Sequence, residues 1–370
     1  MRVGIVGCGY VADYYVSTLG GHPGLALAGV ADRSEERLRR FCAHHGVMPY
    51  SSLGRMLEDP SVDIIVNLTN PESHVDVTRA ALEAGKHVYS EKPLALRQRD
   101  AEALLELAAS RGLGLASAPC GVLGETAQTL WKVLRDGRIG RPLLVYAELD
   151  DGPKYFPEYR PRISASGALW PHNDEFRTGC ILEHAGYYLS WLVTFFGPAQ
   201  AVTAFTTCID RNKSADIPAS EHGPDFSVAC IEFASGTLAR LTCSVLAEPN
   251  RALRIIGESG TVWAEDCWDY AAPVRLLETP RPRGTAPTLI APVRGSSIGG
   301  VQKLRHPMDF ARGIAELAES VQSGRASRLS GAFTLHVNEL ALAINEAGRM
   351  GAPVRLSTRF DSMAPMPWAL

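Results

Sequence analysis

The sequence predicts an α/β protein with an N-terminal doubly wound parallel sheet, followed by an α+β domain with a large open, mostly antiparallel sheet. Up to about residue 120, short apolar runs alternate with amphipathic stretches, the pattern of βαβ units. After about residue 140 the apolar runs are separated by turn residues such as Ala234-Ser235-Gly236, which is typical of antiparallel strands. The 370 residues suffice for two domains, which we place at 1–120 and 121–370.

The first 120 residues contain alternating strand and helix patterns. The predicted strands are Val3–Val6, Leu25–Ala31, Ile64–Leu68, His87–Tyr89 and Gly114–Ser117. The predicted helices are Val11–Leu19, Glu35–His45, Ser51–Glu58, Ser73–Ala84 and Arg99–Ser110. In the last of these, Ala101, Leu104 and Ala108 fall on one face, opposite the charged residues. Such a series favours a parallel sheet with helices on both faces.

The rest of the chain predicts a meander of short strands with helices around it. The predicted strands are Leu143–Leu149, Ala201–Thr207, Phe226–Phe233, Thr237–Val245, Leu253–Ile256 and Thr261–Ala264. A helix-rich insert around Gly179–Phe196 separates the first two. The final helices, Met308–Gln322 and Ala332–Ala347, are expected to pack back near the first domain.

Composition excludes several classes of protein. The formal net charge is −3 and no basic stripe is visible, so nothing favours nucleic acid as a partner. No apolar run is long enough to span a bilayer. The eight cysteines include no CxxC pair and several lie in apolar runs, as Cys230 does, which indicates free buried thiols. We therefore expect a reduced, cytoplasmic protein without a membrane segment.

A dinucleotide-binding fingerprint follows the first strand. The segment Gly7-Cys8-Gly9-Tyr10-Val11-Ala12 has the GxGxxA form, in which Gly7 allows a tight turn and Gly9 lets the backbone approach a pyrophosphate. Ala12 keeps the helix close to the strand, and the N-terminal end of that helix attracts phosphate. The fingerprint predicts a Rossmann domain that binds a nicotinamide dinucleotide through this segment, Tyr10 and Val11 included.

Asp32 lies at the end of the second predicted strand, near the usual distance of about 20 residues from the fingerprint. Its carboxylate is expected to accept hydrogen bonds from the adenosine ribose; the alternative is that it caps the following helix. An acidic residue there repels a 2′-phosphate and favours NAD, but the neighbouring Arg33 can bind such a phosphate, so NADP stays possible.

Two further segments follow predicted strands, where ligands bind in open α/β sheets. Thr69-Asn70-Pro71 with His74 is one, and Glu91-Lys92-Pro93 is the other. A lysine in this position can act as a general acid or base. On spacing alone, Lys92 can equally be a surface lysine before a proline.

Together these residues resemble the glucose–fructose oxidoreductase/inositol dehydrogenase/MocA family along nearly the whole chain. The resemblance rests on Gly7–Ala12, Glu91-Lys92-Pro93, Gly140-Arg141-Pro142, Asp309–Gly313 and His336–Glu339. It implies that Lys92 polarises or protonates the substrate oxygen and that Glu91 lies near the nicotinamide ribose. It also implies a large open sheet used for oligomerisation, hence a homodimer or homotetramer.

The chain departs from the family where Asp-x-Gly-x-His is usual. In one register Glu183 takes the place of the aspartate and Tyr187 that of the histidine; in the other, His184 and Tyr188 do. We favour the first, counting back from Gly197. Either pair is four residues apart and shares a helix face. A tyrosine near Lys92 can relay a proton, because an ammonium lowers the pKa of a phenol.

Residues 169–177 are expected to form a loop that contacts substrate. Trp170 offers an aromatic face, and Asn173, Asp174 and Tyr188 offer polar groups, a combination that suits a sugar. The alternative is a surface connection. Upstream, Lys154, Tyr155, Arg160 and Arg162 can bind an anion or be solvated. No metal site is expected, since the side chains of the adjacent His44 and His45 should diverge.

The sequence thus favours hydride transfer between NAD(P) and a secondary alcohol or ketone carbon of a sugar, cyclitol or sugar derivative. Lys92 is expected to stabilise the developing alkoxide, and Tyr187, or alternatively His184, to move the proton. Glu183 is the fourth expected catalytic residue. Two alternatives stay open: a redox-neutral glycosidase or lyase that uses NAD, and a non-catalytic NAD sensor. The substrate itself is not set by the fold.

Overall fold

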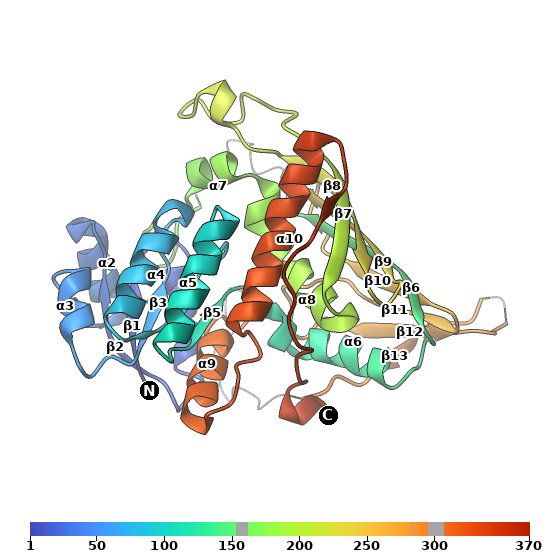
Figure 1. Ribbon diagram of the computed structural model, residues 1–370, viewed down its shortest axis with the longest axis horizontal. Helices are drawn as coiled ribbons and strands as arrows, with labels where there is room; N and C mark the ends of the chain where they lie inside the picture. The colour runs from blue at the N-terminus through green and yellow to red at the C-terminus, as the bar shows by residue number, and fades with distance from the viewer. Residues whose placement is uncertain (153–161, 283, 295–306) are drawn as a thin grey trace.

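The computed structural model describes residues 1–152, 162–282, 284–294 and 307–370. These residues form one parallel sheet of five strands and one mostly antiparallel sheet of nine. In Figure 1 the N-terminal segment lies on one side, the second sheet on the other, and α10 (Gly331–Met350) runs between them. Nowhere in this described part of the chain is a helix long and apolar enough to cross a membrane.

The first sheet follows the predicted strands closely. Its members are β1 (Arg2–Val6), β2 (Ala26–Ala31), β3 (Ile64–Asn67), β4 (His87–Ser90) and β5 (Leu115–Ser117), all parallel, in the order β2-β1-β3-β4-β5. The whole of β3 is buried, which explains its continuous apolar run. The strand order reverses between β1 and β3, and such a switch point opens a crevice at the carboxyl ends of the strands.

Five helices connect these strands. They are α1 (Ala12–Leu19), α2 (Glu35–His45), α3 (Leu53–Glu58), α4 (His74–Glu83), preceded by the 3-10 turn Pro71–Ser73, and α5 (Gln98–Ser110). Ser34 and Ser52 cap α2 and α3, because their hydroxyls accept the backbone N–H groups of Arg37 and Arg55. The capping residue of α2 is therefore Ser34 and not Asp32.

The second sheet is more complex than the predicted meander. Its strands are β6 (Pro142–Asp150), β7 (Ala199–Thr207), β8 (Phe226–Phe233), β9 (Leu238–Ser244), β10 (Leu253–Gly257), β11 (Gly260–Ala264), β12 (Val274–Glu278), β13 (Thr288–Ile290) and β14 (Val354–Arg355). The order is β13-β12-β11-β10-β6-β9-β8-β7-β14. The first strand, β6, lies between β10 and β9 and runs parallel to β9, so the expectation of a simple meander was wrong. Strands β12 to β14 were not predicted.

Five helices and several short turns accompany this sheet. The helices are α6 (Glu125–Arg135), α7 (His172–Thr178), α8 (Gly186–Phe196), α9 (Arg312–Ser323) and α10, with a π-helical turn at Ile181–Ala185 and 3-10 turns at Gly121–Leu123, Ala219–Glu221 and Pro367–Ala369. Helix α10 contacts α5 and β5 as well as α8 and β7. A single cluster of buried apolar side chains extends from Ile5 and Val66 in the first sheet to Leu241 and Ile255 in the second.

Candidate active site

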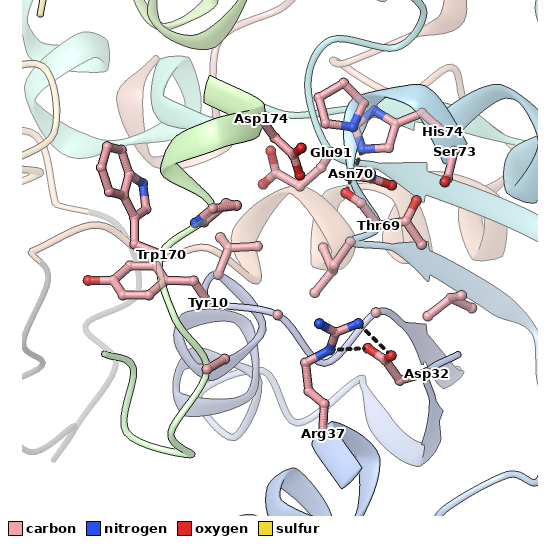
Figure 2. A pocket seen from close by; sticks show the side chains of 18 of the residues that line it. Tyr10, Asp32, Arg37, Thr69, Asn70, Ser73, His74, Glu91, Trp170 and Asp174 are labelled. Atoms are coloured by element: carbon pink, nitrogen blue, oxygen red, sulfur yellow. Dashed lines mark hydrogen bonds and ion pairs between the residues drawn. The ribbon is translucent and has the colours of Figure 1, made fainter. Parts of the chain in front are cut away.

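A cavity of about 900 Å³ opens at the carboxyl ends of the first-sheet strands and is closed on the far side by α7 and the π-helical turn. Figure 2 shows side chains from both halves facing it, among them Asp32 and Thr69 from one and Trp170 and Asp174 from the other. Most of the predicted site residues line it: Gly7, Gly9, Tyr10, Val11, Asp32, Arg33, Thr69, Asn70, His74, Glu91, Lys92, Trp170, Asp174, Glu183, His184 and Tyr187. Ala12, Asn173 and Tyr188 do not.

The glycine loop after β1 is shaped to let a ligand approach the backbone. Gly7 has φ +100°, and a Cβ there would lie 2.6 Å from the carbonyl oxygen of Leu68, so only glycine fits the turn. A Cβ on Gly9 would meet nothing within 4 Å, which leaves space on the cavity side. Ala12 is buried at the start of α1, where a small residue packs. This loop therefore suits the pyrophosphate of a dinucleotide.

At the adenosine end, Asp32 is paired with a residue that the sequence analysis missed. Its carboxylate accepts two hydrogen bonds from the Arg37 guanidinium (2.7 and 2.9 Å). Backbone N–H groups of Cys8 (2.7 Å) and Ser34 (2.8 Å) also donate to it. Burial raises the pKa of Asp32, but these hydrogen bonds outweigh burial and hold it below its usual range. Nothing in the fingerprint pattern signals Arg37.

His74 joins the loops that follow β3 and β4. Its Nδ1 lies 2.7 Å from the carbonyl oxygen of Pro93, and its Nε2 lies 2.9 Å from that of Thr69. The ring is buried, and this burial lowers its pKa. Because Pro93 directly follows Lys92, His74 fixes the segment that carries the lysine.

Lys92 forms an ion pair with Glu183 across the cavity, 2.6 Å from Nζ to Oε2, and both side chains are largely shielded, 18% and 13% exposed. Burial lowers the pKa of Lys92, but the carboxylate of Glu183, with smaller contributions from Tyr187 and Glu91, raises it above its usual value. Lys92 therefore stays an ammonium. Glu91 accepts a hydrogen bond from the Tyr15 hydroxyl at 2.7 Å, which orients it.

The π-helical turn and the first turn of α8 together bring three side chains to the cavity. In a π-helical turn the residues are spaced differently around the axis than in an α-helix. Glu183, His184 and Tyr187 all line the cavity. Tyr188 is buried instead, and its hydroxyl donates to the backbone carbonyl of Arg251. The geometry agrees with the register that pairs Glu183 with Tyr187, and Tyr188 as a substrate contact was wrong.

The predicted effect of Lys92 on the pKa of Tyr187 is present, but burial outweighs it. Burial raises this pKa well above its usual value, and the nearby Lys92 ammonium lowers it by less. Tyr187 is therefore a neutral phenol that donates a hydrogen bond. Within the described residues its hydroxyl has no hydrogen-bond partner, so it can serve a ligand.

His184 lies between two carboxylates. Its Nε2 is 3.2 Å from Glu175 Oε1 and 3.5 Å from Asp151 Oδ2. Trp268 packs beside it and beside Tyr187, with ring centroids 6.3 and 5.3 Å away. Asp151, Glu175 and Trp268 were missed, because they come from three distant segments that meet only in the folded chain.

The segment 169–177 is not the loop that was expected. Helix α7 begins at His172, and Asp174 and Glu175 in its first turn stabilise it through the helix dipole. Trp170 is only 8% exposed and packs with Phe176 and Ile217. Asn173 is turned away from the cavity, since its amide oxygen accepts the Ser214 hydroxyl at 2.8 Å. Asp174 lines the cavity, and burial, with the nearby Glu72, raises its pKa.

Two expectations about other charged or metal-binding residues can also be checked. Arg162 lines the cavity, whereas Lys154, Tyr155 and Arg160 lie outside the described residues. The side chains of His44 and His45 do not diverge; their ring centroids are 4.6 Å apart, and both rings approach Asp13.

Comparisons with known proteins agree with this geometry. A family model described as an oxidoreductase family with an NAD-binding Rossmann fold matches residues 1–118, and a GFO/IDH/MocA C-terminal domain model matches residues 127–263. The uncharacterized oxidoreductase YdgJ of Escherichia coli is 28% identical over 204 residues, which cover 55% of this chain and 56% of that protein. The chain thus matches about half the length of that relative.

Two other similar proteins are matched over nearly their whole length. The dTDP-3,4-didehydro-2,6-dideoxy-alpha-D-glucose 3-reductase of Streptomyces violaceoruber is 24% identical over 354 residues, 95% of this chain and 96% of that protein. An oxidoreductase from Agrobacterium radiobacter, solved in complex with NAD+, L-tartaric acid and magnesium, has a TM-score of 0.77 at 18% identity and covers 96% of this chain and 98% of its own. At this identity the structural likeness shows the fold.

Proposed function

The chain belongs to the GFO/IDH/MocA oxidoreductase family, and from this premise we propose that it is an NAD(P)-dependent dehydrogenase or reductase. Its substrate is a secondary alcohol, or the corresponding ketone, of a sugar, cyclitol or sugar derivative. The observation that carries the proposal is the buried Lys92–Glu183 pair, which faces the cavity beyond the glycine loop. The name of the Streptomyces relative, a reductase of a dTDP-linked keto sugar, supports a carbohydrate substrate.

In such a reaction, some residues of the chain bind the cofactor and others stabilise charge on the substrate oxygen. The glycine loop, Asp32 and Thr69 hold the dinucleotide, whose nicotinamide ring supplies the hydride chemistry when it is bound. The Lys92 ammonium stabilises negative charge that develops on the substrate oxygen, and Glu183 keeps the ammonium in place. Tyr187, a neutral phenol, donates a second hydrogen bond to the same oxygen.

A redox-neutral reaction that uses NAD is the second candidate, because the cavity contains another acid–base group. His184 with Glu175 and Asp151 is separate from the Lys92–Glu183 pair. Such a group can move a second proton, as an elimination or a hydrolysis requires.

The test begins with fluorescence titrations of NADH and NADPH, followed by absorbance of the nicotinamide against a panel of polyols, inositols and amino sugars. We expect one cofactor to bind and one polyol to change the absorbance. Lys92→Ala should keep cofactor affinity and lose about 1000-fold in turnover. Lys132→Ala, which removes a partly exposed lysine of α6 that does not line the cavity, is the control. Glycoside cleavage without an absorbance change favours the second candidate, and failure to bind either cofactor contradicts both.

We also propose that the outer face of the second sheet joins two copies of the chain. Tyr146, Phe205 and Leu238 on its strands are 37%, 61% and 50% exposed. Exposed apolar groups on one sheet face favour association. Light scattering after size exclusion tests this, and a monomer at micromolar concentration contradicts it.

A further inference from the structure

A cluster of metal-ligating side chains lies outside the cavity, between α1 and α2. Asp13 is in the first turn of α1, and His44 and His45 form the last turn of α2. One ligand atom from each of the three lies within 4.8 Å of the other two. None of the three lines the cavity, so the cluster is not part of the site described above.

Asp13 is a buried anion without a permanent cation. It is 6% exposed, and in the part of the chain that the structure describes no lysine or arginine pairs with it. Its carboxylate faces the imidazole of His45 and is hydrogen-bonded to Ser166. A carboxylate in such a shielded position gains more from a bound cation than an exposed one does.

The other oxygen of Asp13 is fixed in the way that metal ligands often are. Its Oδ2 accepts the backbone N–H of Ser166 at 3.2 Å and the Ser166 hydroxyl at 2.9 Å. Hydrogen bonds of this kind orient a ligating carboxylate and leave its other oxygen for the metal. Here the other oxygen, Oδ1, faces His45 Nε2 at 2.5 Å.

The two histidines complete a nitrogen-rich set at a favourable end of a helix. The rings of His44 and His45 are nearly perpendicular, at 89°. Helix α2 ends at His45, before Gly46, and the carbonyl groups of the last turn of a helix favour a cation. His44 is exposed, so its ring is free to rotate toward the other two ligand atoms.

We propose that Asp13, His44 and His45 bind one divalent transition-metal ion of the zinc type, with water as the fourth ligand. One carboxylate and two imidazoles suit Zn²⁺, whereas Mg²⁺ and Ca²⁺ prefer oxygen alone. Bonds of about 2.0–2.2 Å in a tetrahedron place ligand atoms about 3.3 Å apart. To reach these distances, Asp13 Oδ1 and His45 Nε2 have to move slightly apart, and the His44 ring has to move toward both. Rotation of the side chains allows both movements.

Such an ion would connect three segments. Asp13 belongs to α1, and His44 and His45 belong to α2. Ser166, which is hydrogen-bonded to Asp13, belongs to the segment that leads to Trp170 at the cavity. The ion therefore stabilises the approach of this segment to the first sheet, and its effect should appear in thermal stability first.

The experiment uses the full chain without an affinity tag, stripped of metal and titrated with Co²⁺. We expect one equivalent to bind with the visible absorption of a tetrahedral site, to be displaced by Zn²⁺, and to raise the melting temperature. His44→Ala removes one ligand and leaves the His45–Asp13 hydrogen bond in place, so it should fold normally and bind at least tenfold more weakly. His45→Ala should bind more weakly still.

Two controls address other donors. His172→Ala removes a histidine elsewhere, and Cys42→Ser removes the thiol one turn before His45; both should bind Co²⁺ like the wild type. The proposal is overturned if the wild type binds no stoichiometric Co²⁺, if His44→Ala binds equally well, or if Cys42→Ser abolishes binding. NADH titration of the same samples shows whether cofactor binding is intact, independently of the metal.

Discussion

Around the glycine loop the chain lets a ligand approach its backbone, whereas at the substrate end of the cavity it presents ionisable side chains. The cofactor end depends on the turn at Gly7 and on loops at the ends of neighbouring parallel strands. The substrate end depends on buried pairs such as Lys92–Glu183, whose members lie 91 positions apart. Ligand binding at the first end depends on the shape of the backbone, whereas the chemistry at the second end depends on the balance of charges. Substitutions at the first should therefore change binding and stability, and substitutions at the second should change turnover.

The largest effect is expected for Gly7→Ala. A Cβ at φ +100° would lie 2.6 Å from a backbone carbonyl, so we expect a loss of about 3 kcal/mol in the free energy of unfolding, and loss of cofactor binding. Urea unfolding and NADH titration measure the two effects. Gly85→Ala is the matched control, because Gly85 also has positive φ (+77°) but its Cβ would meet nothing within 4 Å. Equal losses in the two variants would show that the contact with Leu68 does not matter.

Glu183→Gln should affect only the substrate end of the cavity. It removes the charge that raises the pKa of Lys92, so the basic limb of kcat/KM against pH should move to lower pH. We expect kcat to fall about 100-fold while the Kd for NADH changes less than about threefold. Glu183→Asp keeps the charge and should recover part of the activity. A fall in cofactor affinity as large as the fall in kcat would contradict the separation of cofactor binding from catalysis at the two ends of the cavity.

Tyr187→Phe should have a smaller effect on the same end. It removes a donor to the substrate oxygen and keeps the ring against Trp268, so kcat should fall about 30-fold. Because the hydroxyl has no hydrogen-bond partner in the described residues, the free energy of unfolding should change by less than about 0.5 kcal/mol. Since burial raises the pKa of Tyr187, the wild type should show no alkaline limb that this variant lacks. Such a limb would instead identify Tyr187 as a base.

The smallest effect is expected for Arg37→Ala, which tests how charge contributes at the cofactor end. Without Arg37 the Asp32 carboxylate is free for ribose hydroxyls, whereas a 2′-phosphate loses a cationic partner. NADPH should bind about tenfold more weakly and NADH no more weakly than before. Fluorescence titration with both cofactors measures the ratio, and Arg39→Ala, which removes an exposed arginine of the same helix that does not line the cavity, is the control. Equal weakening of both cofactors would show that Arg37 only supports the loop.

The same contrast explains what could be predicted from the sequence. Strands β1 and β3 were predicted to within one residue, because buried parallel strands are continuous apolar runs and the glycine turn is local. Helix α7 was missed, since its polar residues follow Pro171 and resemble a loop. Asp151, Glu175 and Arg37 were missed for another reason. Some of these residues form charge pairs between distant segments, and Arg37 pairs with Asp32 across a loop and one helical turn. Such pairs produce no periodic pattern in the sequence.

The site was nonetheless partly predictable where a motif fixed its position. Glu91-Lys92 and the pairing of Glu183 with Tyr187 follow from positions relative to glycines. The π-helical turn that brings His184 to the same cavity depends on packing against the second sheet, and so does the burial of Tyr188. Neither could be predicted from the sequence. Burial also outweighs the expected effect of Lys92 on the pKa of Tyr187, because the sequence shows the neighbouring charge but not the loss of solvent.

The continuous apolar core between the two sheets bears on cooperativity. One buried cluster includes side chains of both sheets, so the two domains cannot lose all of their packing independently, although a second cluster, which includes Val88 and Leu104, belongs to the first domain alone. We expect a single calorimetric transition for the whole chain, with the calorimetric and van't Hoff enthalpies equal. A dinucleotide bound only by the first sheet should then raise the melting temperature of both, so that a ligand at one sheet protects amide hydrogens in the other from exchange.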